Sequence, residues 1–227
     1  MKTATIAPNA SSVGLTDIEF ATNPEARCGC CIAADISDSM KGRPIAELNT
    51  GLIELKHCLV ADPLACLRVE LALISFNSVV KTEVDFTGPT TFQPPTLIPS
   101  GGTSLGAAVI QGLDLIKART AGYRAAGLPC FRPWLVVITD GEATDDITEA
   151  ARLVKEMETQ KRVAFFGVGV QSANMHKLAE LSHRAPLRLD GLRFSDWFQW
   201  LSASLSAVAL SRPGDQVPLP PPDWAAV

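Results

Sequence analysis

Three polar stretches hold the side chains of this sequence that could do chemistry together. The stretches are "DISDSM", which directly follows the apolar "CGCCIAA", then "SGGTSLG", and finally "TDGEATDD". Between them they carry five oxygen-bearing side chains, which are Asp35, Ser37, Ser39, Thr103 and Asp140. Two carboxylates and three hydroxyls are hard ligands, and they suit Mg2+, Mn2+ or Ca2+ better than Zn2+.

The charge of this set indicates recognition rather than catalysis. Two carboxylates would neutralise a divalent ion, and hydroxyl ligands would leave that ion electron-poor. An open position on such an ion accepts a carboxylate from outside. We therefore expect a partner protein that offers an Asp or Glu side chain. The set contains no pair of nucleophile and base, so we expect no enzyme activity.

The elements that must position these residues follow from short apolar runs that alternate with helical patterns. We expect strands at 30–34, 68–76, 79–86, 134–139, 163–170 and 187–189, and helices at 44–59, 105–120, about 147–160, 174–184 and 195–209. This order predicts an α/β fold, with a Rossmann-like, doubly wound, mostly parallel sheet and helices on both faces. A hairpin through Asn77-Ser78 adds one antiparallel edge strand. Ligands of such sheets bind beyond the carboxyl ends of the strands, near the three polar stretches.

Composition divides the chain into three parts. Residues 1–26 are a polar N-terminal extension, 27–211 are the folded domain, and 212–227 are a proline-rich tail. The tail contains "VPLPPPDW", which favours a stiff polyproline II segment. We expect Trp224 to dock the tail on the domain, because an exposed Trp reduces solubility.

Several classes of protein are disfavoured by the same composition. The formal net charge is −4 and no basic stripe is present, so we expect no nucleic-acid partner. No apolar run approaches the ~18 residues of a membrane span, and the N-terminus lacks the pattern of a signal peptide. We expect a cytoplasmic protein with reduced thiols. Cys28, Cys30 and Cys31 are then buried apolar residues rather than a zinc or redox site, since neighbours on a strand face opposite ways.

The three stretches resemble the metal-ion-dependent adhesion site of von Willebrand factor type A (VWA) domains. The shared motifs are D-x-S-x-S, a Thr after Gly-Gly, and T-D-G after a parallel strand. The phrases "NPEARC", "SFNSVVK", "FQPPTLIPSGGTSLGAA" and "ITDGEATDD" resemble the bacterial tellurium-resistance TerY subgroup from residue 23 to about 209. One departure is Asp38, where the family commonly has Gly. It adds a negative charge beside the site.

This resemblance implies roles for the five residues and a setting for the protein. Ser37, Ser39 and Thr103 would contact the metal directly, and Asp35 and Asp140 would act mainly through water. The protein would be an intracellular, metal-dependent protein-binding module of a bacterial stress or tellurite-resistance system, beside kinase- or phosphatase-like partners.

Two other functions are compatible with parts of the sequence. The first is a structural or scaffold VWA protein whose metal site takes no ligand. The second is a hydrolase, because "GTSLG" matches G-x-S-x-G around Ser104, and Asp140 and His183 follow in the right order. The preceding "FQPPTLIPSG" contains three prolines, so it cannot be the central strand that this motif requires.

Two groups of residues near these motifs have structural interpretations. Glu142, Asp145 and Asp146 form an acidic rim or cap the helix that follows them. Trp197 and Trp200 lie three positions apart on a predicted helix, which indicates a stripe that faces the core.

Overall fold

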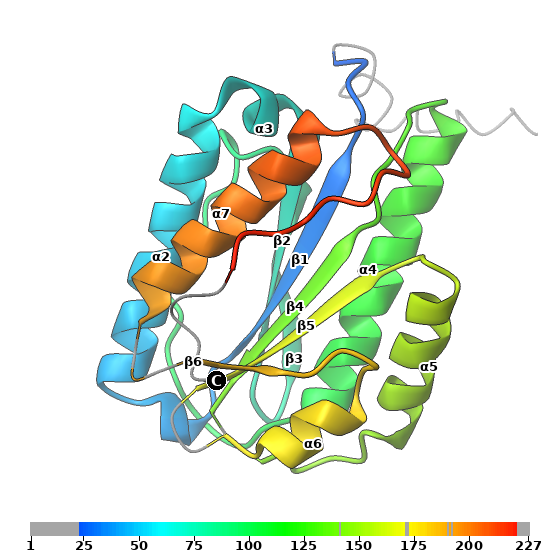
Figure 1. Ribbon diagram of the computed structural model, residues 1–227. Coiled ribbons are helices and arrows are strands. Elements are labelled where there is room, and N and C mark those ends of the chain that lie inside the picture. Colours follow the sequence, from blue (N-terminus) through cyan, green and yellow to red (C-terminus); the bar gives the residue numbers. More distant parts are fainter. Residues whose placement is uncertain (1–22, 141, 171–172, 190, 192, 222–227) are drawn as a thin grey trace, which may run out of the picture.

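The computed structural model describes residues 23–140, 142–170, 173–189, 191 and 193–221, and at its centre lies one six-stranded sheet (Figure 1). The strands are β1 (Cys28–Asp35), β2 (Val69–Phe76), β3 (Val80–Thr87), β4 (Trp134–Thr139), β5 (Ala164–Val170) and β6 (Leu187–Leu189). Their spatial order is β3-β2-β1-β4-β5-β6. Only the pairing of β2 with β3 is antiparallel. The predicted mostly parallel sheet with one antiparallel edge strand is confirmed.

Helices cover both faces of the sheet. One face carries α2 (Arg43–Ala61), α3 (Pro63–Arg68) and α7 (Phe194–Leu210), and the other carries α4 (Leu105–Ala125), α5 (Thr148–Thr159) and α6 (Met175–Glu180). Side chains along β1 point alternately to the two faces of the sheet. Cys30 and Ile32 therefore belong to the core under α2 and α7, while Cys31 and Ala33 belong to the core under α4. All eight β1 residues are buried. Burial of the three cysteines confirms that prediction.

The order of the strands creates a switch point between β1 and β4. The chain leaves β1 toward β2 on one side, and it returns after β3 to place β4 on the other side. Connections from β1 and β4 therefore diverge at their carboxyl ends, which is where doubly wound sheets bind ligands. β1 ends at Asp35, and Asp140 directly follows β4.

The lengths of two helices differ from the prediction, and tertiary contacts explain both differences. α4 continues past residue 120 to Ala125, and its last turn buries Tyr123. α6 ends at Glu180 rather than at 184. The carboxylate of Glu158 in α5 accepts hydrogen bonds from Ser182 Oγ (2.8 Å) and from the backbone N–H of His183 (3.0 Å), which holds the chain outside a helix.

The short helix α3 is absent from the prediction, although a local signal exists for it. Asp62 caps the helix by accepting hydrogen bonds from the N–H groups of Leu64 and Ala65, both 3.0 Å long. Pro63 occupies its first turn, a position that needs no N–H donor. The dipeptide Asp62-Pro63 was therefore a local signal for the start of this helix, whereas the spacing of apolar residues gave no such signal.

Close contact between α2 and α7 fixes the core on their face of the sheet. A Cβ on Gly51 of α2 would lie 2.1 Å from the ring of Phe198 in α7, so only glycine fits there. Trp197 and Trp200 are both buried, which confirms the predicted core-facing stripe. None of the described helices combines the length and apolar character needed to cross a membrane.

The described part of the proline-rich tail, red in Figure 1, runs back alongside α7. Leu219 packs against the core, and the indole Nε1 of Trp200 donates a 2.7 Å hydrogen bond to the carbonyl of Pro220. The predicted docking residue Trp224 lies outside the described residues. The segment up to Pro221 is held by the body of the domain in a different way, through Trp200.

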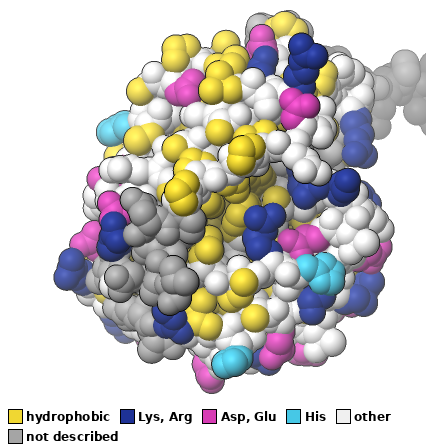
Figure 2. All heavy atoms as spheres, in the orientation of Figure 1, with side chains coloured by type: hydrophobic (Ala, Val, Ile, Leu, Met, Phe, Trp, Pro, Cys, Tyr) yellow, Lys and Arg dark blue, Asp and Glu magenta, His cyan; other side chains and the backbone are white. Residues whose placement is uncertain are grey.

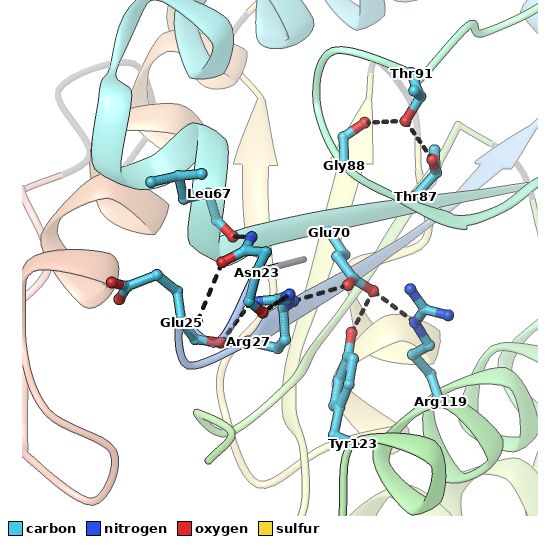
Figure 3. Close-up of polar contacts among 10 residues, drawn as sticks. All are labelled: Asn23, Glu25, Arg27, Leu67, Glu70, Thr87, Gly88, Thr91, Arg119 and Tyr123. Carbon is cyan, nitrogen blue, oxygen red and sulfur yellow. Dashed lines mark hydrogen bonds and ion pairs between the residues drawn. The ribbon is translucent and has the colours of Figure 1, made fainter. Parts of the chain in front are cut away.

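The end of the sheet where the parallel strands begin holds a buried ion cluster (Figure 3). Glu70 in β2 is 4% exposed and forms an ion pair with Arg27 (3.2 Å). Its other oxygen accepts hydrogen bonds from Arg119 Nε (2.6 Å) and the Tyr123 hydroxyl (2.5 Å), both from α4. The guanidinium of Arg27 also donates to the carbonyls of Asn23 and Glu25, so the cluster fastens the segment before β1.

Candidate metal site

The first polar stretch turns sharply at the end of β1 because Asp35 is hydrogen-bonded to its surroundings. Asp35 is fully buried, and its Oδ1 accepts a 2.7 Å hydrogen bond from the N–H of Ser37. Its Oδ2 accepts from the hydroxyl of Thr139 at the end of β4 (2.5 Å). Asp35 thus ties the ends of the two central strands together.

A chain of hydrogen bonds joins the rest of this stretch to Asp140. The hydroxyls of Ser37 and Ser39 lie 2.9 Å apart, and Ser39 Oγ donates to Asp140 Oδ1 at 2.6 Å. Ser37 and Asp140 are buried, whereas Ser39 is exposed and so lies at the mouth of the site. Four of the five predicted residues are therefore connected across the switch point, although 101 positions separate Ser39 from Asp140.

Thr103 reaches the same edge through its backbone. Its loop is fastened to the first stretch, because Asp38 N–H donates to the carbonyl of Gly101 (3.0 Å). Gly101 has a φ of +75°, which favours glycine at this turn. Thr103 is buried and exchanges two hydrogen bonds with Thr144 in the third stretch. Among the described residues, no side-chain hydrogen bond links Thr103 to the other four.

Burial perturbs both carboxylates of the site. It raises the pKa of Asp35 to about 6, against hydrogen bonds from Thr139 and Ser37 that lower it. The charge of Asp140 raises the pKa of Asp35 further. Burial also raises the pKa of Asp140, and the hydrogen bond from Ser39 opposes that shift. In the described chain neither carboxylate forms an ion pair, so both charges lack a compensating cation.

The donor set fits a hard divalent ion and does not fit a thiolate-bound one. Within the described ranges, no group of three or more His, Cys, Asp and Glu side chains could hold a metal, so an ion here would depend on hydroxyl oxygens as well. Burial raises the pKa of Cys28 and Cys31 to about 12, which disfavours the thiolates that zinc requires. The oxygen set at the switch point is the better candidate.

The acidic residues of the third stretch have structural partners. Asp145 accepts hydrogen bonds from the first backbone N–H groups of α4 (3.1 and 2.9 Å), so it caps an earlier helix rather than the following one. Asp146 accepts hydrogen bonds from the N–H and the hydroxyl of Thr148, the first residue of α5, whose N-cap position is Ile147. Glu142 accepts from the amide of Asn174. These contacts hold the third stretch in place beside the site.

The sequence did not identify Thr139 and Thr144 as residues that position the site. Thr139 stands in the T-D-G motif, which was the available signal, whereas nothing local marks Thr144. Ser104 follows an irregular loop rather than a strand, and its N–H donates to the carbonyl of Asn77. The strand–turn–helix geometry of a hydrolase nucleophile is therefore not formed at Ser104.

Solved structures share this fold. The pilus adhesin SpaC from Lactobacillus rhamnosus GG in its open conformation has a TM-score of 0.64 and 13% identity, over 82% of this chain and 31% of that one. Proximal thread matrix protein 1 from the mussel byssus, with a zinc-occupied metal-ion-dependent adhesion site, has a TM-score of 0.54 and 14% identity, over 81% and 49%. The SpRpn10 VWA domain has a TM-score of 0.51 and 12% identity, over 75% and 93%. The chain thus spans less than half of the adhesin and byssus proteins.

The sequence places the chain within one family. No protein with a curated description matches it. The family model of the von Willebrand factor type A domain matches residues 31–194, a range that includes all five residues of the candidate site. That match covers more than half of the chain, and the strand order and the polar switch point agree with it. The chain belongs to the von Willebrand factor type A domain family.

Proposed function

We propose that this protein is a metal-dependent protein-binding module with no enzyme activity of its own. The observation that carries the proposal is the pair of buried carboxylates, Asp35 and Asp140, which are linked through hydrogen bonds of Ser37 and Ser39 and lack a basic partner in the described chain. Such a pair is costly to keep ionised unless a cation compensates it. The hydroxyls at its mouth would complete the oxygen set.

Mg2+ is the proposed ion, with Mn2+ and Ca2+ as alternatives. Ser37, Ser39 and Thr103 would hold it directly, with Asp35 and Asp140 acting mainly through water. When bound, the ion would supply a Lewis-acidic position for a carboxylate. The zinc reported for the byssus protein makes Zn2+ a necessary competitor in any test.

The proposed partner is a protein that offers an Asp or Glu side chain at this edge of the sheet. The phrases "FQPPTLIPSGGTSLGAA" and "ITDGEATDD" resemble the TerY subgroup, and they support a place in a bacterial stress or tellurite-resistance system. The same resemblance supports a cytoplasmic protein beside kinase- or phosphatase-like partners.

Calorimetry with Mg2+, Mn2+, Ca2+ and Zn2+ tests the metal part of the proposal. We expect saturable binding of Mg2+ or Mn2+ and a melting temperature that rises with the concentration of the ion. Ser39→Ala should weaken binding about tenfold, because it removes one neutral ligand, about 1.4 kcal/mol. Thr159→Ala is the matched control, since it removes an exposed hydroxyl of α5 whose one hydrogen bond among the described residues goes to the carbonyl of Lys155.

Binding of a partner must depend on the ion. Proteins captured from a native extract in Mg2+ should be lost in EDTA and lost with Asp140→Ala. Capture that is unchanged under both conditions would contradict the proposal and favour a scaffold whose metal site takes no ligand. Esterase or phosphatase activity that Ser104→Ala abolishes would contradict the absence of catalysis.

A further inference from the structure

A groove lies at the end of the sheet opposite the candidate metal site. Its walls include Trp134 and Ala164, the first residues of β4 and β5, whereas Asp140 follows the last residue of β4. Strands of six or seven residues at ~3.3 Å per residue place the two sites roughly 20 Å apart. The groove has a volume of about 540 Å³, and the tail segment from Gly214 to Leu219 forms one wall of it.

Packed aromatic rings form the floor of the groove. Figure 2 shows a hollow lined by hydrophobic side chains, with Lys and Arg side chains at its edge. The rings of Trp134 and Phe166 pack at 4.7 Å between centroids, and Arg184 lies 4.6 Å above the ring of Phe166. Both rings are buried, so a bulky apolar side chain in the groove would contact mainly the partly buried Val208 and Leu219 above them.

The rim of the groove carries positive charge that the described chain leaves without an acidic partner. Arg132, Lys161 and Arg184 line it, and none forms an ion pair with another described residue. The single acidic residue of the wall, Asp215, accepts a hydrogen bond from the N–H of Arg212. The neighbouring pocket adds the basic side chains of Arg124 and Arg162 and no acidic one, and its third basic residue, Lys117, is paired with Asp114 (3.1 Å). This concentration of cations contrasts with the formal net charge of −4.

The dipoles of nearby helices account for only part of this charge. Arg124 lies in the last turn of α4, and Lys161 and Arg162 follow the end of α5, where cations are favourable. Arg132 and Arg184 belong to loops that lead into β4 and toward β6, so no helix end explains them. Both side chains are exposed, so their charges are available to an acidic occupant.

The tail wall favours an extended occupant over a compact ion. Among the described residues, the backbone N–H groups of Gln216, Val217 and Leu219 take part in no hydrogen bond. An extended segment beside the wall could pair with them as an added strand does. Pro220 and Leu219 anchor the far end of this wall to Trp200 and to the core.

From these observations we infer a second interaction surface: the groove between the start of β4 and β5 and the tail binds an extended acidic peptide that carries a large apolar side chain. The carboxylates of the peptide pair with Arg132 and Arg184, and its apolar side chain rests on the partly buried Val208 and Leu219. This surface is independent of the metal site, so one chain can hold two partners at opposite ends of its sheet.

Fluorescence anisotropy with a labelled hexapeptide tests the inference. In the peptide, glutamates alternate with phenylalanine and leucine, and every measurement is made on the full chain in EDTA to exclude the metal site. We expect saturable binding that weakens with added salt. The double variant Arg132→Glu with Arg184→Glu should weaken binding at least tenfold, with an unchanged far-UV spectrum.

The matched control reverses two exposed charges at the other end of the sheet, Lys41→Glu with Arg43→Glu, and it should bind the peptide as the wild type does. A peptide with glutamine in place of glutamate should bind at least tenfold more weakly. The inference is overturned by an equal loss in both double variants, by equal affinity for the glutamine peptide, or by no saturation at millimolar peptide. Complete competition by millimolar inorganic phosphate would also overturn it, because the groove would then be a simple anion site.

Discussion

Carboxylates are buried at both ends of the central sheet, but their surroundings differ. Glu70, at the end where the parallel strands begin, is surrounded by Arg27, Arg119 and the hydroxyl of Tyr123. At the other end, Asp35 and Asp140 contact hydroxyls and backbone N–H groups and no cation within the described chain. Glu70 has its counter-charges within the fold, whereas Asp35 and Asp140 have none among the described residues.

This difference separates a structural cluster from a site that needs something from outside. A buried charge that is paired and hydrogen-bonded within the fold holds segments together, as Glu70 does for the segment before β1 and for α4 (Figure 3). A buried pair without a cation destabilises the protein until one binds. Four predictions test this contrast, in order of decreasing effect.

Glu70→Ala should cause the largest loss of stability. It leaves the buried Arg27 without its counter-charge and removes an acceptor from Arg119 and Tyr123, and removing one partner of a buried ion pair costs about 3–5 kcal/mol. Urea unfolding measures the loss as a lower midpoint. Glu149→Ala is the control, because it breaks an exposed ion pair with Arg152 and should leave the midpoint nearly unchanged. Equal unfolding midpoints for the two variants would contradict a structural role for the cluster.

The metal-free protein should lose stability as the pH rises from about 4 to 7. The folded-state pKa of Asp35, about 6, lies above the ordinary value of 3.8. Between these values the folded state holds more protons than the unfolded state, so its stability falls with rising pH, by up to about 3 kcal/mol. Urea unfolding in EDTA across this range measures the effect.

Asp35→Asn is the control for this pH dependence. It removes the titrating group and should flatten the decline between pH 4 and 7. Saturating Mg2+ should also reverse the decline in the wild type, because the ion compensates the carboxylates. Stability that rises through this window in EDTA would show that other groups dominate the titration.

Removal of charge should weaken Mg2+ binding more than removal of a neutral ligand. We expect Asp140→Asn to weaken binding about 100-fold, and Thr103→Ala about tenfold, because hard cations gain more from carboxylates than from hydroxyls. Calorimetry measures both. Both variants should keep the wild-type fold, which circular dichroism checks. A larger effect of Thr103→Ala would mean that Asp140 lies outside the ligand set.

Truncation after Arg212 should have the smallest effect on stability. It removes the packing of Leu219 and the hydrogen bond from Trp200 to Pro220, together worth about 1–2 kcal/mol. The melting temperature should fall by about 2–8 °C. Mg2+ affinity should stay unchanged, since the described part of the tail, up to Pro221, forms no hydrogen bond with either carboxylate of the site. An unchanged melting curve would mean that the docked tail adds nothing to stability.

Local pattern in the sequence was enough to predict the architecture and to nominate the residues of the candidate site. Buried strands such as β1 and β4 are continuous apolar runs, and the face of α2 repeats at steps of three and four, so their types follow from hydrophobic periodicity alone. The order of elements then implied a parallel sheet, and the parallel sheet implied that Asp35 and Asp140 end at one edge. Each of these inferences requires only the types of residues close together in the chain, or a general rule of sheet topology.

Other features of the protein were decided by tertiary structure alone, because they depend on contacts between residues far apart in the chain. No local pattern pairs Glu70 with Arg27 and Arg119, which lie 43 and 49 positions away, or assigns Asp145 to the start of α4, 38 or 39 positions before it. The end of α6 likewise depends on Glu158 in α5. The sequence itself determined which side chains could bind a cation. Only the fold decided which buried carboxylate has its cations within the chain and which does not, because burial and counter-charge are set by packing.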